Sequence, residues 1–326
     1  MLTVHEATRA LMPFRQSLMA DPATMAYNAP WFPPDGTIPF PEEDWDGWLA
    51  AWTNSAPERW CAYLSNEAGD MVGEISYHHS GQDMSVVIAA PFRGRGYGRE
   101  ALALLAAEAF RHPEISELRN CFEATRTPAL RTHLAAGFVR VAEKDGLLTL
   151  RLTRERFEAR RRAQWLRQTT DAMCAWDAGS PQRIHHFLKV QGFARQIALA
   201  EGLSDEARFT LETAALTHDI GIKPALQLHG ACGGALQERL GPPEASRMLT
   251  ALGLPEPVVR RVCFLISRHH TTQGVDGPDW QILLEADFLV NMIEGGLSPE
   301  AIDAYRDTVF RTDEGKRLLA WVRQTA

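Results

Sequence analysis

The sequence predicts two domains of different fold class, an N-terminal α/β domain followed by a C-terminal all-α domain. Its 326 residues exceed the roughly 100–200 residues of a typical single domain. Strand-like and helical runs are interleaved up to about residue 150, whereas from about residue 180 the apolar residues recur with helical spacing and hardly any strand pattern. We therefore expect domains at 1–155 and 180–326, joined by a linker helix over 156–179.

Composition narrows the class of protein. Hydrophobic residues make up 45% and charged residues 23% of the chain, as in ordinary globular proteins, and the net charge of −7 argues against a general nucleic-acid binder. No apolar run reaches the roughly 18 residues that a membrane span needs. The cysteines lie far apart without zinc-type spacing, so we expect reduced thiols in a cytoplasmic protein: Cys61, Cys121, Cys174, Cys232 and Cys263.

The strands of the first half are marked by β-branched and aromatic runs. "RWCAYLSNEAGDMVGEISYHH" predicts two strands around a turn, and "MSVVIAA" predicts a third. The helix "GREALALLAAEAFRH" follows, and "AAGFVRVAEKDGLLTLRL" predicts a closing hairpin that turns at Asp145-Gly146.

The second half reads as a series of helices. Seven arginines between Arg151 and Arg167 favour a solvated connecting helix over a nucleic-acid contact. Further helices are expected at about 182–200, 204–218, 242–252, 255–269, 279–294 and 298–323.

A glycine-rich loop lies between the third strand and its helix. Such a loop directs backbone N–H groups and the positive end of the helix dipole at a bound anion, and its glycines allow phosphate to approach closely. The loop therefore predicts a pyrophosphate site at Arg93, Gly94, Arg95, Gly96, Tyr97 and Gly98.

This segment resembles the coenzyme A loop of the GNAT superfamily of N-acetyltransferases, and the Gly-Phe of "HLAAGFVRV" is similar to theirs. The resemblance covers most of residues 1–150. It implies a mixed sheet with flanking helices and acetyl-CoA as cosubstrate. It also implies that the pantetheine arm of the cosubstrate binds the strand backbone at Val86, Val87 and Ile88.

Two residues depart from the GNAT pattern. His133 stands where many of these enzymes have a tyrosine that protonates the leaving thiolate, and Arg126 stands where an asparagine is common. Histidine can act as a general acid near neutral pH, so His133 is a candidate to protonate the leaving thiolate in place of the tyrosine. Glu123 or Glu74 is the candidate base for the acceptor amine, with an exposed surface acid as the alternative for each.

Residues 27–52 are rich in tryptophan and in acids. Together these residue types suit a cationic amine acceptor beside the active site. The alternative is an amphipathic helix that packs its tryptophans inward.

The helical half contains ligand-type residues on apolar helix faces. His186 belongs to the apolar stripe of its helix, His218 and Asp219 end another helix, and Asp287 stands among leucines and a valine. A buried aspartate costs several kcal/mol unless it is paired or binds a metal. Two imidazoles and two carboxylates suit Mn, Co, Fe, Ni or Zn.

The order His, His-Asp, Asp resembles the HD superfamily of metal-dependent phosphohydrolases, over about residues 180–326. The resemblance implies a helical bundle, metal ligands at His186, His218, Asp219 and Asp287, and hydrolysis of a phosphoester, typically of a nucleotide. Asp219 would also orient the attacking water.

Two-metal relatives have a further histidine where this chain has Gly241, so one metal is favoured over two. His269 and His270 are then candidates for phosphate binding or for protonation of the leaving group. His229 is expected in an exposed loop, and Glu238 and Glu244 are expected only to support the ligands.

The leading hypothesis is a bifunctional enzyme that acts on an amine and on a small phosphoester. A second makes the first half a sensor that binds acetyl-CoA without turnover and regulates the hydrolase. A third makes the helical half a ligand-binding or scaffolding module, although its intact ligand set speaks against this. The sequence leaves the oligomeric state open.

Overall fold

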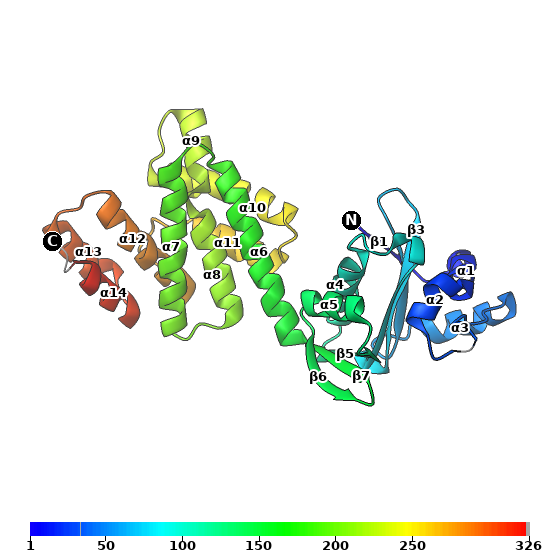
Figure 1. The fold of residues 1–326 in the computed structure, drawn as a ribbon. Coiled ribbons are helices and arrows are strands. Elements are labelled where there is room, and N and C mark those ends of the chain that lie inside the picture. The colour runs from blue at the N-terminus through cyan, green and yellow to red at the C-terminus, as the bar shows by residue number, and fades with distance from the viewer. Residues whose placement is uncertain (33, 324–326) are drawn as a thin grey trace. The chain divides into compact units, whose positions relative to one another are not determined.

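The computed structural model describes residues 1–32 and 34–323 and confirms the expected fold class. The chain divides into two compact units, Met1–Arg160 and the residues from Arg161 onward. The first unit is α/β and the second is helical (Figure 1). Each has its own hydrophobic core.

The first unit contains two antiparallel sheets. One has the order β1-β2-β3-β4 and the other β5-β7-β6. The predicted strands and the hairpin turn at Asp145-Gly146, where both residues have positive φ, are present. The strands are β1 (Thr3–Glu6), β2 (Trp60–Ser65), β3 (Met71–His78), β4 (Asp83–Ile88), β5 (Glu117–Glu123), β6 (Val139–Lys144) and β7 (Leu147–Thr153).

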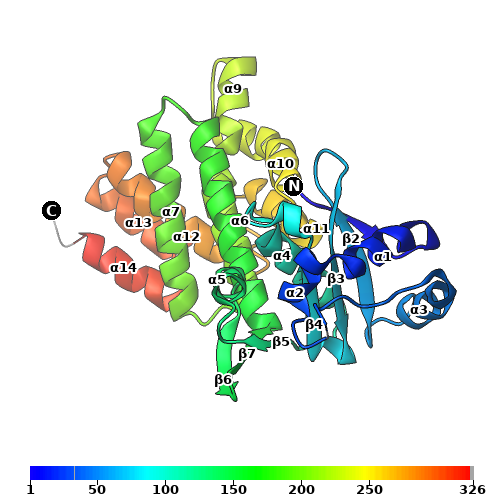
Figure 2. The same cartoon turned by 45° about the vertical axis from the view of Figure 1, so that its right-hand side comes forward.

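Helices cover both faces of these strands, with α4 and α5 on one side and α1 and α3 on the other (Figures 1 and 2). The five helices are α1 (Met12–Ala20), α2 (Pro22–Asn28), α3 (Trp45–Trp52), α4 (Tyr97–Ala109) and α5 (Thr127–Ala136). In α3, Trp45 and Trp48 pack against Phe40, as the alternative interpretation of this segment expects. The acids Glu42 and Asp46 pair with Arg9.

The arginine-rich segment is helix α6 (Arg154–Trp176), and it is more than a solvated connection. Arg154 donates to the carbonyls of Phe110, His112 and Ile115, just beyond the end of α4. Arg156 and Arg160 donate to the carbonyls of Gly137 and Ala135 at the end of α5. These guanidinium groups therefore satisfy and neutralise the C-terminal ends of two helices. Farther along α6, three residues are buried in the second unit: Trp165, Thr169 and Met173.

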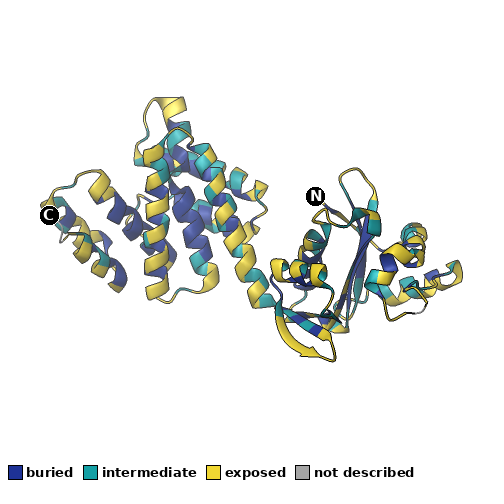
Figure 3. Cartoon of the chain, viewed as in Figure 1, coloured by how far each residue is buried: buried dark blue, intermediate teal, exposed yellow. Residues whose placement is uncertain are grey.

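The second unit is built around α8, whose residues from Phe209 to Thr217 are all buried, and around α12 (Figure 3). The elements are α7 (Pro181–Ala200), α8 (Asp205–Thr217), the 3-10 turn η5 (His218–Gly221), α9 (Ile222–His229), α10 (Gly234–Ala251), α11 (Glu256–Ile266), α12 (Pro278–Glu294), α13 (Pro299–Val309) and α14 (Asp313–Arg323). None of the helices in the described ranges has the length and hydropathy that a membrane crossing needs.

Three features of this unit differ from the sequence-based expectation. Helix α10 starts at Gly234 and continues through Pro242 and Pro243, where the sequence suggested a helix start. Helix α9 was not expected. The single helix expected over 298–323 is two helices, because the buried carboxylate of Glu285 accepts hydrogen bonds from the backbone N–H groups of Arg311 and Thr312 and thereby holds the chain in a turn.

Candidate active sites

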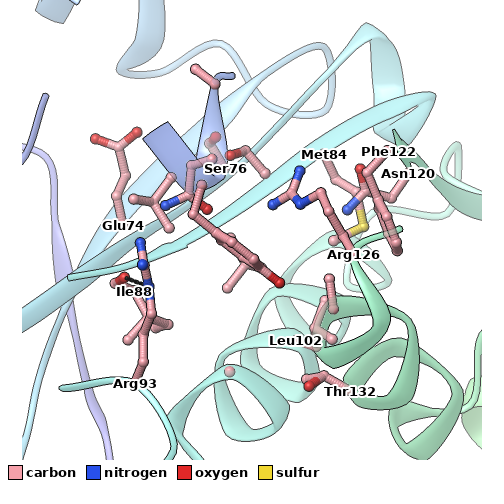
Figure 4. Close-up of a pocket in the computed structure, with 18 of the residues that line it drawn as sticks. Glu74, Ser76, Met84, Ile88, Arg93, Leu102, Asn120, Phe122, Arg126 and Thr132 are labelled. Atoms are coloured by element: carbon pink, nitrogen blue, oxygen red, sulfur yellow. Dashed lines mark hydrogen bonds between the residues drawn. The ribbon is translucent and has the colours of Figure 1, made fainter. Parts of the chain in front are cut away.

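The first site lies where the two sheets of the first unit separate. Strands β4 and β5 belong to different sheets, and a pocket of about 720 Å³ lies along both of them (Figure 4). Its walls include Val86, Val87 and Ile88 of β4, and Gly94 and Gly96 of the glycine-rich loop. The segment predicted to hold acetyl-CoA thus borders a single cavity.

The glycine-rich loop reaches α4 through two residues in left-handed conformation, Gly94 with φ 76° and Gly96 with φ 87°. No atom lies within 4 Å of the positions that side chains would occupy there, so the loop is open to an approaching ligand. Because the first N–H groups of a helix have no intrahelical partner, those of α4 remain available to an anion.

Arg93 has a different role from its neighbours in the loop. Its guanidinium donates to the carbonyls of Ile88 at 3.1 Å, Ala23 at 3.0 Å and Thr24 at 2.7 Å, and so ties β4 to α2 (Figure 4). The exposed arginines beside the loop are Arg95 and Arg99.

Of the two candidate bases, Glu74 lines the pocket and Glu123 does not. Glu74 is 5% exposed, and burial raises its pKa although the Nε atom of Arg15 lies 3.2 Å from its carboxylate. A carboxylate with a raised pKa is suited to accept a proton. Glu123 lies 3.6 Å from Arg126 in an ion pair.

His133 lines the same pocket, but both of its ring nitrogens are engaged. Its Nδ1–H donates to the carbonyl of Ala129 at 2.8 Å, and its Nε2 accepts from the amide of Asn120 at 2.9 Å. Burial lowers the pKa of His133 to about 4. The ring is therefore neutral near pH 7 and, in this arrangement, has no proton to give to a leaving thiolate.

The second site is a cluster of four donor atoms from α7, η5 and α12. The Nε2 atom of His186 lies 3.1 Å from that of His218, 3.2 Å from Asp287 Oδ1 and 3.5 Å from Asp219 Oδ2. His218 Nε2 lies 3.5 Å from each of the same two carboxylate oxygens. Ligands bound tetrahedrally at 2.0–2.2 Å from an ion are about 3.4 Å apart, so the spacing fits a divalent transition metal.

Each imidazole of this cluster is oriented by its other nitrogen. Nδ1 of His186 lies 2.9 Å from Glu294 Oε2, and Nδ1 of His218 lies 2.9 Å from the carbonyl of Ala215. Because a carbonyl and a carboxylate accept hydrogen bonds, the Nδ1 atoms carry the protons and the Nε2 lone pairs face the cluster.

The charges of the cluster attract a cation. Burial disfavours the charged form of His218, but Asp219 and Asp287 outweigh it and raise its pKa to about 9. Burial likewise opposes ionisation of Asp219, yet His218 and His269 lower its pKa to about 2. Two ionised carboxylates in a buried site thus compete for any proton or metal that enters.

His269 and His270 lie beside the cluster and differ from each other. His269 is 1% exposed, its Nδ1 donates to the carbonyl of Ile266, and its buried Nε2 has no hydrogen-bond partner and lies 3.6 Å from Asp219 Oδ1. His270 is exposed and uses its Nε2 on the side chain of Gln237. These two histidines and Asp219 bring their ligand atoms within 4.8 Å of one another.

The position of Gly241 explains why no further histidine stands there. A Cβ atom on Gly241 would lie 2.6 Å from a methyl group of Ile266, so this part of α10 has no room for a side chain.

Residues 2–139 match the family model of the acetyltransferase (GNAT) domain, and residues 183–313 match that of the HD domain. The chain joins a GNAT domain to an HD domain. The pocket lies in the GNAT domain and the four-donor cluster in the HD domain.

Solved acetyltransferases share similarity with the first half of the chain. Spermidine N-acetyltransferase from Vibrio cholerae, in complex with CoA and spermine, is 11% identical with a TM-score of 0.41, covering 48% of this chain and 98% of that chain. Aminoglycoside acetyltransferase AAC(6')-Ib, in complex with coenzyme A and kanamycin, is 18% identical with a TM-score of 0.39, covering 49% and 99%. No curated protein matches the chain.

The supporting residues of the HD domain were only partly foreseen. Glu238 accepts from the backbone of His270 and the hydroxyl of Thr271, whereas Glu244 pairs with Arg247 on the surface. His229 is exposed, at the end of α9. Glu294 was missed, although it lies seven residues after Asp287, which places both on one face of α12.

Proposed function

We propose that the chain is a bifunctional enzyme. Its GNAT domain transfers the acetyl group of acetyl-CoA to an amine, and its HD domain hydrolyses a small, nucleotide-like phosphoester with the help of one divalent metal.

The acetyltransferase proposal is supported by Glu74, a buried carboxylate in the wall of the pocket between β4 and β5. Glu74 takes a proton from the ammonium group of the acceptor, and the freed amine attacks the thioester carbonyl. The C–N bond forms, the C–S bond breaks, and the remaining extra proton on nitrogen passes to the departing sulfur. Because the amine itself supplies that proton, the step does not require His133 as an acid.

The hydrolase proposal is supported by four donor atoms spaced 3.1–3.5 Å apart in the five pairs given above. A divalent metal bound there supplies Lewis acidity, which acidifies water and polarises a phosphoryl oxygen. Asp219 directs one oxygen at the cluster and the other toward His269, so it is placed to orient the water. His269, whose Nε2 is unpartnered, is the group we assign to the phosphate or the leaving oxygen.

Acetyl-CoA consumption with a panel of amines tests the first activity, with Glu74→Gln as the inactive comparison. We expect thioester loss only when an amine is present, and a large decrease in the variant. Binding of CoA without turnover of any amine would instead support the sensor hypothesis.

Release of phosphate from nucleoside mono- and diphosphates, and release of the alcohol from a generic phosphodiester, test the second activity with added Mn²⁺, Co²⁺ or Zn²⁺. We expect activity that a chelator abolishes and that Asp219→Ala lacks. Unchanged hydrolysis in that variant would contradict the proposal.

A further inference from the structure

The guanidinium of Arg126 is an unusual group in the GNAT pocket. Arg126 lines the pocket at the start of α5, and its side chain is only 16% exposed. An arginine side chain carries five N–H donors. Within the described residues none of these donors makes a hydrogen bond, and the buried Nε atom has no partner.

The contacts that Arg126 makes leave its N–H donors without hydrogen-bond acceptors. Its guanidinium lies 4.4 Å from the ring centre of Tyr27, and its ion pair with Glu123 spans 3.6 Å, which is too long for a hydrogen bond. Arg93 also lies over the ring of Tyr27, at 4.9 Å, but it donates to three carbonyls. Buried polar groups are nearly always hydrogen-bonded, so the unused donors of Arg126 point to a ligand.

Arg126 lines the same pocket as the candidate base. Glu74 and Ser76 are two residues apart on β3, so their side chains leave the same face of the strand and both line the pocket. Figure 4 shows the guanidinium of Arg126 extending into the pocket on the side of Ser76. A cation and a proton acceptor therefore border the same cavity.

We propose that the acceptor is an amine that also carries a carboxylate, such as an amino acid, and that Arg126 binds this carboxylate. The inference rests on the proposed acetyltransferase function and names its substrate class. A guanidinium presents paired N–H donors that match the two oxygens of a carboxylate. Ser76 adds a hydroxyl beside them, and Glu74 receives the proton of the amine.

The pocket is poorly suited to a polycationic amine. The acids Glu42 and Asp46 of the segment 27–52 pair with Arg9 and do not line the pocket. The acids that line it are Glu74 and Asp83, against four arginines: Arg15, Arg93, Arg99 and Arg126.

Acetylation of matched acceptors tests the proposal. The pairs are L-phenylalanine with phenethylamine and L-ornithine with 1,4-diaminobutane, which differ only in the carboxylate. We expect kcat/KM to favour the amino acid by about 10-fold or more, since one charge-assisted bidentate contact distinguishes the two. Arg126→Gln should remove this preference by raising the KM of the amino acids by about 10–100-fold. The kcat/KM of the decarboxylated amines should stay within about 2-fold of the wild-type value. Arg126→Lys should restore part of the preference.

Two controls separate this role from others. Arg131→Gln removes an exposed arginine of α5, the helix that follows Arg126, and should leave the preference intact. The Kd of CoA, measured by calorimetry, should be equal in wild type and Arg126→Gln. Equal use of both members of each pair by the wild type, or a weakened Kd of CoA in the variant, would overturn the proposal. If Arg126→Gln does not fold, Arg126→Lys takes its place in both measurements, with a smaller loss of the preference expected, because lysine keeps the charge but lacks the paired donors.

A binding measurement distinguishes failure of the inference from failure of the proposed function. If no amine is acetylated, N-acetyl-L-phenylalanine and N-acetylphenethylamine are titrated into the protein with CoA present. Binding of only the carboxylate compound, lost in Arg126→Gln, would keep the carboxylate site while the acetyltransferase function fails. If neither compound binds, both the carboxylate site and the proposed acetyltransferase function are contradicted.

Discussion

The Nε2 atoms of His186 and His218 lie 3.1 Å apart in the HD domain, although each ring directs its Nδ1 at another acceptor. Two lone pairs at this distance repel each other unless a cation lies between them. Asp219 and Asp287 complete the same cluster, so the repulsion is resolved by a proton or by a metal. A metal satisfies all four groups at once, whereas a proton satisfies two.

Removal of Asp287 should empty the site. Asp287→Asn is expected to lower bound metal from about one ion per chain to below about 0.1, because a neutral amide replaces one of two charged ligands. Elemental analysis of the purified protein measures this. Asp279→Asn is the control, since Asp279 is a buried acid of the same helix that is bound by Arg261. Equal metal loss in both variants would indicate a general effect on folding.

Glu294 should tune the metal affinity without binding the metal itself. Glu294→Gln is expected to weaken metal binding by about 10–100-fold, because the carboxylate that orients His186 and increases its basicity is lost. Competition with a chromophoric chelator measures this. Lys189 also binds Glu294, so Lys189→Gln leaves the contact with His186 in place and should have a much smaller effect.

His269 should matter for hydrolysis more than for metal retention. We expect His269→Gln to keep one ion per chain and to lower kcat by about 100-fold, the usual contribution of a general acid or base. His270→Asn should have a weaker effect, because His270 directs its Nε2 at Gln237. A wild type with two ions and a His269→Gln variant with one would show that His269 is a ligand of a second metal.

Glu74 should set the acidic limb of acetyltransferase activity. Burial raises its pKa, so activity is expected to fall as the pH drops toward that raised value and Glu74 becomes protonated. Arg15 favours the ionised form, and Arg15→Gln should therefore move the limb to higher pH. Glu74→Gln should remove the limb and lower kcat by about 100-fold or more. A pH profile of kcat/KM for the three proteins checks this, and an unmoved limb would argue for another base.

His133 should appear in the pH dependence of stability rather than in catalysis. Its pKa is about 4 in the folded protein and 6.5 ordinarily, so the unfolded chain binds the proton more readily. Its contribution to the free energy of unfolding is present above pH 6.5 and is lost toward pH 4, by up to roughly 3 kcal/mol. Urea unfolding between pH 7.5 and 4.5 should show a smaller decrease for His133→Phe than for wild type. A 100-fold lower kcat in that variant would instead restore His133 as the acid.

Local patterns predicted much of this protein. Strand β4, the glycine-rich loop and helix α4 follow from β-branched residues, glycines and helical spacing over one continuous segment. The four ligand-type residues could also be recognised, because a histidine or an aspartate on an apolar helix face is costly without a partner. These signals lie within a few turns of one chain segment, where periodicity and residue chemistry are informative.

Only the tertiary structure decided which of these groups are free to act. The guanidinium of Arg93 is taken by carbonyls of α2. His133 is neutral because burial lowers its pKa, and its Nε2 is occupied by Asn120 of β5. Glu294 reaches His186 across 108 residues, and Glu285 holds the turn between α13 and α14 from 26 and 27 residues away. Distant segments bury these side chains and form hydrogen bonds with them, which decides whether each side chain is protonated and whether it is free to bind a ligand. A local sequence pattern does not contain this information. The pair His218-Asp219 thus indicated a candidate metal site from the sequence, while the fold determined how the candidate ligands are oriented.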